Sequence, residues 1–254
     1  MSELERVLDF LRRADEGAST AVEPFRFGVA YFNAEIPRVY DRNFLLVTAD
    51  ADAVDRRSLT EAADALQGGA GLAHRKVVFE DARVGKRVGG ALARAGWEHR
   101  RLAIMVYRGG ADPAAGAAAS EVDRVALLPA LEALIRSEPW GGDEDVVRQL
   151  SAADAALGGA VAQRCFAHLV EGRVVSSCRL YSDDSIAQIE DVATVPGHRQ
   201  RGYAGTVVTR AVNEAVAAQD LVFLTVVDGR WVKRWYERLG FEQIGLRHEA
   251  TRTG

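Results

Sequence analysis

The spacing of apolar residues changes repeatedly between strand-like and helix-like along the second half of the chain. Two helices are expected first, then three strands of which the first two form a hairpin, and then helices and strands in alternation. The predicted elements are helices over 122–136 and 143–157, strands over 164–169, 174–181 and 187–195, a helix after Gly202, a strand over 221–227, a helix over 229–239 and a strand from Phe241. This order predicts an α/β (α+β) fold with a mixed central sheet flanked by helices.

The first half carries a similar but weaker pattern. An amphipathic surface helix is expected over 1–14, because apolar residues recur there at helical spacing among charged ones. The other predicted elements are strands over 25–31, 43–48, 75–79 and 100–107 and helices over 57–67 and 82–95. Late in each half a helix reaches a glycine that an aromatic residue follows, as in Gly96-Trp97 and Gly240-Phe241. We therefore expect two diverged copies of one fold.

Composition places the chain among ordinary globular proteins and adds a boundary between its halves. Of its 254 residues, 48% are hydrophobic and 27% are charged. A net charge of −4 gives no general attraction to nucleic acid or to anionic membranes, and no apolar run is long enough to span a bilayer. Small, turn-prone residues predict a linker over 111–120 between domains over 1–110 and 121–254. We expect a cytoplasmic protein with no nucleic-acid or membrane partner.

The two cysteines lie on the strands of the predicted hairpin. If Glu171-Gly172 is a two-residue loop, Cys165 lies directly across from Cys178. Such a pair could act as a redox switch, but two buried, reduced thiols are the favoured interpretation in a cytosolic protein. The spacing of the histidines and cysteines supports neither a metal site nor a Cys-His nucleophile.

The segment Arg199–Ala204 forms a predicted anion site between a strand and a helix. Pro196-Gly197 ends the strand, and apolar residues beyond the segment recur at helical spacing. Backbone N–H groups at a helix N-terminus have no partners within the helix and donate readily to an anion. Gly202 lets a phosphate approach the backbone closely, while Arg199 and Arg201 add positive charge. The segment is therefore suited to a cofactor that carries phosphate.

A second signal lies further along the chain, in Trp231–Phe241. Tyr236 belongs to its apolar stripe, so its hydroxyl is expected to lie partly in the cleft of the sheet and to need a partner. Together, the R-x-x-G-x-A pattern from Arg199 and the Trp-Tyr-x-x-x-Gly-Phe pattern from Trp235 resemble the GNAT superfamily of acetyl-CoA-dependent N-acetyltransferases. Ile189–Ala193 also resembles the strand that precedes the loop in that family. The resemblance covers the second half of the chain.

This resemblance implies a site for acetyl-CoA as a co-substrate. The pyrophosphate would be held by backbone amides of 200–205, and the pantetheine arm would pair with the edge of 192–194 as an added strand does. Family members commonly have an asparagine five residues before the tyrosine. This chain has Trp231 there, whose ring is expected to pack against cofactor or substrate. The implied cofactor-binding residues are Val192, Ala193, Thr194, Arg199, Gln200, Arg201, Gly202, Tyr203, Ala204, Gly205 and Trp231.

The resemblance also implies catalytic residues. Tyr236 matches the tyrosine that protonates the departing thiolate, and a strand N–H near Val192 would polarise the carbonyl oxygen. An amine must lose a proton before it attacks, and Glu190 and Asp191 are the candidate acceptors. Successive strand residues point to opposite faces, so a regular strand lets only one of them reach the cleft. A bulge could change which one does, and both residues remain candidates.

The first half is expected to be a degenerate GNAT-like domain. The position that matches Tyr236 is Leu92, which has no phenol, and the segment Ala49–Asp55 carries carboxylates where phosphates would bind. The motif-like stretch Lys86–Ala91 is interpreted as part of a helix. This half would then shape the substrate cleft or an interface in a homodimer.

The sequence predicts an N-acetyltransferase that acts on a primary amine of a small molecule or peptide. A non-catalytic acyl-CoA-binding regulatory module is the alternative, because a chain that has lost turnover would keep the same anion site. A nucleotide-binding α/β domain would need a G-x-G-x-x-G or P-loop sequence, and the chain has neither.

Overall fold

The computed structural model describes residues 1–253, with only the backbone of Asp154, and divides into two compact units. Unit 1 contains Met1–Ile104, Val226–Lys233 and 243–253, and unit 2 contains Met105–Thr225 and Arg234–Glu242. The C-terminal strand therefore belongs to the first unit, although the predicted boundaries assign it to the second half. None of the helices in the described part of the chain has the length and apolar character that a membrane span requires.

Unit 1 is built on strands in the order β1-β2-β3-β4-β11-β5. Its elements are α1 (Glu3–Gly17), β1 (Ala21–Phe25), β2 (Gly28–Phe32), η1 (Tyr40–Arg42), β3 (Phe44–Val47), η2 (Ala51–Ala53), α2 (Arg56–Gly69), β4 (His74–Phe79), α3 (Ala82–Val84), the π-helical turn η3 (Gly85–Gly89), α4 (Gly90–Ala93) and parts of β5 (Glu98–Tyr107) and β11 (Phe241–Thr253). β3 and β4 pair in parallel, whereas β11 runs antiparallel to β4 with His248 opposite Phe79. The long final strand thus completes this sheet.

The short, wholly apolar strand β3 shows how unit 1 forms its core. Leu45 and Val47 pack into the cluster that contains Leu59 of α2 and Leu92 of α4. Phe44 and Leu46 pack into a second cluster, because successive strand residues point to opposite faces. Both faces of this strand are therefore covered.

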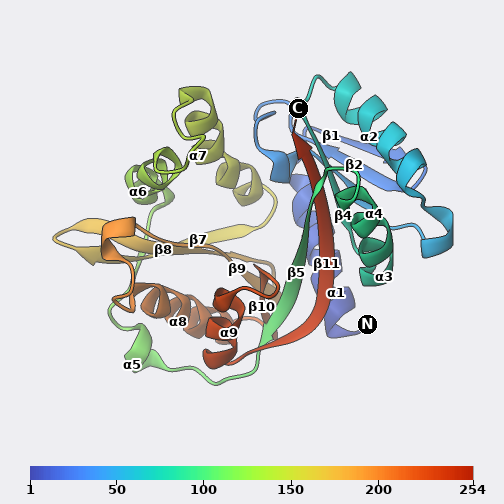
Figure 1. Cartoon of the computed structure of the whole chain (residues 1–254). Helices are drawn as coiled ribbons and strands as arrows, with labels where there is room; N and C mark the ends of the chain where they lie inside the picture. Colours follow the sequence, from blue (N-terminus) through green and yellow to red (C-terminus); the bar gives the residue numbers. More distant parts are fainter. Residues whose placement is uncertain (254) are drawn as a thin grey trace. The chain divides into compact units, whose positions relative to one another are not determined.

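Unit 2 is a sheet with helices on both faces. Its further elements are α5 (Pro113–Gly116), β6 (Ser120–Val122), α6 (Arg124–Arg136), α7 (Glu144–Gly158), β7 (Ala162–Val170), β8 (Arg173–Ser182), β9 (Ile186–Thr194), η4 (Pro196–His198), α8 (Tyr203–Val216), β10 (Leu221–Val227) and α9 (Trp231–Arg238), some of which extend into unit 1. The helices α6 and α7 lie on one side of β7 and β8, and α8 lies on the other (Figure 1). The strands follow the order β10-β9-β8-β7-β6. The predicted mixed sheet flanked by helices is confirmed.

Local structure differs from the predictions where chain geometry departs from regular spacing. The predicted strand over 25–31 is a hairpin of β1 and β2 that turns at Arg26-Phe27. The predicted linker contains α5, which packs against α8, and Asp112 exchanges two hydrogen bonds of 2.8 Å with the Asn213 side chain. These contacts make the segment a structured part of unit 2.

The predicted register of the cysteines is wrong by one residue. The hairpin turns at Glu171-Gly172, with φ of 51° and 74°, but an irregularity between His168 and Leu169 shifts the pairing. Cys165 consequently lies opposite Arg179, and Cys178 lies opposite Phe166. Cys165 packs against Leu127 of α6, while the Cys178 thiol donates to the carbonyl oxygen of Val207 in α8, 3.3 Å away. Both thiols are free and buried, on opposite faces of the sheet.

Candidate functional site

The loop before α8 has two residues in the left-handed conformation. Gln200 has φ +63° and Gly202 has φ +80°, and Gly202 is the N-cap of α8 without a side chain that caps the helix. The Gly202 carbonyl oxygen accepts the N–H groups of Gly205, at 2.9 Å, and Thr206, at 3.3 Å. Among described residues no acceptor exists for the N–H groups of 200–204. Left-handed residues in such a turn direct successive N–H groups into a concavity that suits an anion.

Side chains around this loop fix its position. The Arg199 Nε donates to the carbonyl oxygen of Thr194, 3.1 Å away, and ties the loop to the end of β9. The Tyr203 ring stacks on His168 of β7, with centroids 4.1 Å apart. The Nδ1 of that histidine lies 3.2 Å from the Thr206 hydroxyl. The Tyr203 side chain therefore anchors α8 to the sheet, and its backbone N–H is the group available to a ligand.

The parallel strands β9 and β10 separate next to this loop. They share only three register pairs, which end with Gln188 opposite Phe223. β9 continues to Thr194 and β10 to Val227 without further pairing between the two in the described chain. The stretch 189–194 of β9 thus presents an edge to which β10 adds no ladder.

A bulge in β9 decides how its two acidic residues lie. Arg179 faces Glu190 and Ser177 faces Ala193, so Cys178 between them faces the two residues Asp191 and Val192. Asp191 has φ +53°, a conformation that aspartate tolerates better than most residues. The bulge removes the simple alternation of faces that a regular strand would impose.

The carboxylates have different neighbours. Asp191 accepts from the buried Arg179 guanidinium at 3.2 Å, although the aspartate side chain itself is half exposed. Glu190 accepts a short hydrogen bond from the Gln188 side chain. It also lies close enough to Tyr236 to affect the pKa of that phenol. Of the two candidates, Glu190 is therefore the one that shares its surroundings with Tyr236.

Tyr236 has a buried ring and a hydroxyl without a hydrogen bond among the described residues. Its exposed fraction is 6%, and the ring packs against Trp235 and Phe241, with centroids 4.7 and 5.7 Å away. Burial, together with the negative charge of Glu190, raises the pKa of Tyr236 far above its usual value. The phenol therefore keeps its proton at neutral pH and has a free donor.

Unit 2 thus brings together the loop, the edge of β9, Glu190 and Tyr236. Trp231 begins α9 with 70% of its surface exposed and falls in unit 1. Sequence reasoning missed His168, Arg179 and Gln188, whose contacts cross between strands or depend on the bulge. Only the strand-like spacing around Cys178 places Arg179 near β9 in advance, and it does so with the wrong register.

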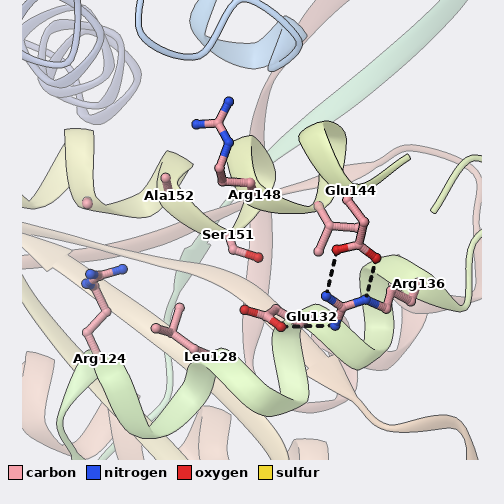
Figure 2. Close-up of a pocket in the computed structure, with 10 residues that line it drawn as sticks. Arg124, Leu128, Glu132, Arg136, Glu144, Arg148, Ser151 and Ala152 are labelled. Carbon is pink, nitrogen blue, oxygen red and sulfur yellow. Dashed lines mark hydrogen bonds and ion pairs between the residues drawn. The ribbon is translucent and has the colours of Figure 1, made fainter. Parts of the chain in front are cut away.

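A separate shallow groove lies between α6 and α7. Figure 2 shows Arg136 directed at Glu132 and Glu144, to which it forms hydrogen-bonded ion pairs of 2.9 and 3.1 Å. Arg148 forms a short ion pair with Asp145. None of the sequence-predicted site residues lines this groove.

Comparison with known families decides what unit 2 is. A model of the acetyltransferase (GNAT) family matches residues 129–241, which contain the loop, the β9 bulge and Tyr236. Residues 129–241 form a GNAT-family domain. The site geometry described above lies wholly within it, apart from the assignment of Trp231 to unit 1. A comparison with curated proteins found no match.

Solved structures share the fold of this GNAT domain and extend over the rest of the chain. A functionally unknown conserved protein from Staphylococcus epidermidis ATCC 12228 has a TM-score of 0.71 at 12% identity, covering 93% of this chain and 94% of that one. A GCN5-related N-acetyltransferase from Kribbella flavida has a TM-score of 0.63 at 15% identity, covering 100% and 97%. One from Sphaerobacter thermophilus has a TM-score of 0.51 at 15% identity, covering 77% and 66%. At these identities the likeness concerns the fold.

Proposed function

We propose that the GNAT domain transfers an acetyl group from acetyl-CoA to a primary amine. The observation that carries this proposal is the left-handed loop at the N-terminus of α8, next to the unpaired edge of β9. A family of acyltransferases and an anion site that no side chain caps together favour a thioester that carries phosphate.

Backbone groups would hold most of the cofactor. The N–H groups of 200–205 would bind the pyrophosphate, and Arg201, which is exposed beside them, would add charge. Arg199 would act indirectly, since its Nε is already bonded to Thr194. The pantetheine amides would pair with 192–194 along the edge that β10 leaves. Trp231 is proposed to pack against cofactor or substrate through its exposed ring.

Glu190 would accept the proton that the amine must lose. An amine with a pKa of about 10.4 is almost wholly protonated at neutral pH, a deficit of roughly 4.6 kcal/mol. A nearby carboxylate, directly or through a water molecule, can take that proton. The proximity of Glu190 to Tyr236 supports this choice, whereas Asp191 is engaged with Arg179. The neutral amine would then attack the thioester carbonyl carbon, with a backbone N–H near Val192 polarising its oxygen.

Tyr236 would protonate the leaving group. Collapse of the tetrahedral intermediate breaks the carbon–sulfur bond and leaves the electron pair on sulfur. The phenol, whose raised pKa keeps it neutral, donates its proton to that thiolate, and solvent restores the proton afterwards. Its free hydroxyl supports the role, because no protein acceptor among the described residues competes for the proton.

Unit 1 is proposed to be a degenerate copy without a cofactor. The order β3, α2, β4 repeats the order β9, α8, β10, with a parallel strand pair in each case. At the N-terminus of α2, however, the Asp55 carboxylate accepts the N–H of Ser58 at 3.0 Å and takes the place that an anion would need. Leu92 is fully buried in the core.

Replacing Tyr236 by phenylalanine tests this function. Turnover of an accepted amine should fall by about 10- to 1,000-fold, while the dissociation constant of acetyl-CoA stays within about twofold, because the ring packing is kept. Glu190→Gln should lower turnover most below the pH at which the free amine becomes abundant. Tyr31→Phe, in unit 1, is the matched control. An unchanged rate for Tyr236→Phe would discard the general acid, and acetyl-CoA binding without transfer to any amine would favour the regulatory module.

A further inference from the structure

Unit 1 contains a buried arginine that lacks a partner. Arg247, on β11, is only 7% exposed, and it forms no hydrogen bond or ion pair with another residue in 1–253. Its Nε is fully buried. A guanidinium cannot lose its charge at accessible pH, so burial without an acceptor is costly. Buried polar groups that lack a protein partner call for a water molecule or a ligand.

Two more unpartnered nitrogens lie in the same unit. The Nε of Arg42, at the end of η1, and the Nδ1 of His74, at the start of β4, are both buried without a hydrogen bond. Arg42 and Arg247 both lower the pKa of Asp15, so the two guanidinium groups lie near one carboxyl group. Only Arg42 contacts it, at 3.6 Å. Burial nevertheless raises the pKa of Asp15 to about 6, so this carboxyl is a poor permanent counter-ion.

The other buried charges nearby have direct partners. Glu80 accepts from Arg12 at 2.8 Å. Lys76 forms one ion pair of 2.8 Å with Glu249 and a short one with Asp41. These residues are therefore not available to Arg247 without breaking an existing pair.

Solvent reaches this cluster at one side. The Asp41 side chain is 74% exposed, whereas its partner Lys76 is 7% exposed. Asp15 and Arg42 are intermediate, at 14% and 17%. A small ligand can thus approach from the Asp41 side without unfolding of the core.

We propose that Arg247 and Arg42 bind a small oxyanion, a carboxylate or a phosphate, in unit 1. The planar guanidinium fork of Arg247 matches either group through two parallel hydrogen bonds. His74 can contribute a further donor through Nδ1, because its Nε2 already contacts the carbonyl oxygen of Asn43 at 2.9 Å. This site is additional to the phosphate loop of the GNAT domain, since its residues belong to unit 1.

Amide hydrogen exchange of the full chain tests the site. Exchange in α1, which carries Asp15, should slow by about fivefold or more in phosphate or acetate, with saturation, relative to chloride at equal ionic strength. Arg247→Met should remove the response. Arg252→Met is the matched control, because Arg252 lies on the same strand but is paired with Asp64. Phosphate bound at α8 would instead slow exchange there and would not depend on Arg247.

Stability separates a binding role from a structural one. In chloride, Arg247→Met should have a Tm equal to or above that of the wild type, because it removes an uncompensated buried charge. A response to only one of the two anions identifies that anion. The proposal is overturned if α1 shows no saturable response in the wild type, if the response survives in Arg247→Met, or if that variant has a markedly lower Tm. Should Arg247→Met fail to fold, Arg247→Lys must still weaken the response, since lysine lacks the fork.

Discussion

Gly202→Ala should weaken coenzyme A binding through backbone strain alone. Gly202 has φ +80°, and a Cβ built on it would meet no atom within 4 Å, so the added methyl group itself has room. The left-handed conformation costs an L-residue about 1–2 kcal/mol. If the free loop relaxes to avoid that cost, binding must restore it, which corresponds to about a 5- to 30-fold increase in the dissociation constant.

Calorimetry with coenzyme A and thermal unfolding measure the two places where this cost can appear. Gly205→Ala is the control, because a Cβ there also meets nothing within 4 Å but the residue lies in α8, where alanine stabilises by about 1 kcal/mol. Gly202→Ala should lose affinity, stability or both, whereas Gly205→Ala should gain stability. If Gly202→Ala matches the wild type in both measurements, the left-handed turn does not form the binding conformation.

Three further predictions concern buried ionisable groups. Burial and the neighbouring His99 lower the pKa of His248 to about 4, so the unfolded chain takes up a proton first as the pH falls. Between pH 7 and pH 4 the wild type should lose up to about 3 kcal/mol of unfolding free energy that His248→Gln does not lose, measured by urea unfolding. Asp15 has a pKa raised to about 6, so its contribution is lost as the pH rises from 4 to above 6, and Asp15→Asn should gain up to about 3 kcal/mol at pH 8 by the same assay. Burial raises the pKa of Cys178, so iodoacetamide should label this thiol only after unfolding, as mass spectrometry can detect.

Each of these predictions has a contradicting result. Parallel pH profiles for His248→Gln and the wild type would show that His248 is protonated equally in both states. An Asp15→Asn variant that is no more stable than the wild type at pH 8 would place the charge of Asp15 in a favourable environment. Rapid labelling of Cys178 in the native protein would require an opening of α8.

Local patterns predicted most elements of unit 2 because each carries a clear period. The strand over 221–227 matches β10, and the glycines of the two helix-glycine-aromatic signals both adopt positive φ, 89° at Gly96 and 97° at Gly240. The turn at Arg26-Phe27 was missed because it contains neither Gly, Pro nor Asn. A propensity argument has no means of finding such a turn.

Register and long-range contacts lay beyond the sequence. One irregularity near His168 moved Cys165 from Cys178 to Arg179, since each inserted residue shifts every later pair. The bulge at Asp191 was weighed in advance but could not be placed. The stacking of Tyr203 on His168 joins residues from different elements, and no spacing indicates it.

The most direct test of the central claim is a screen of amines for coenzyme A release from acetyl-CoA by the wild-type chain. The panel should contain small amines, amino acids, aminoglycoside-like compounds and peptide N-termini, with free thiol detected spectroscopically. The account predicts release that requires one class of amine and falls in Tyr236→Phe. Release that is independent of amine, or equal in wild type and Tyr236→Phe, would contradict it.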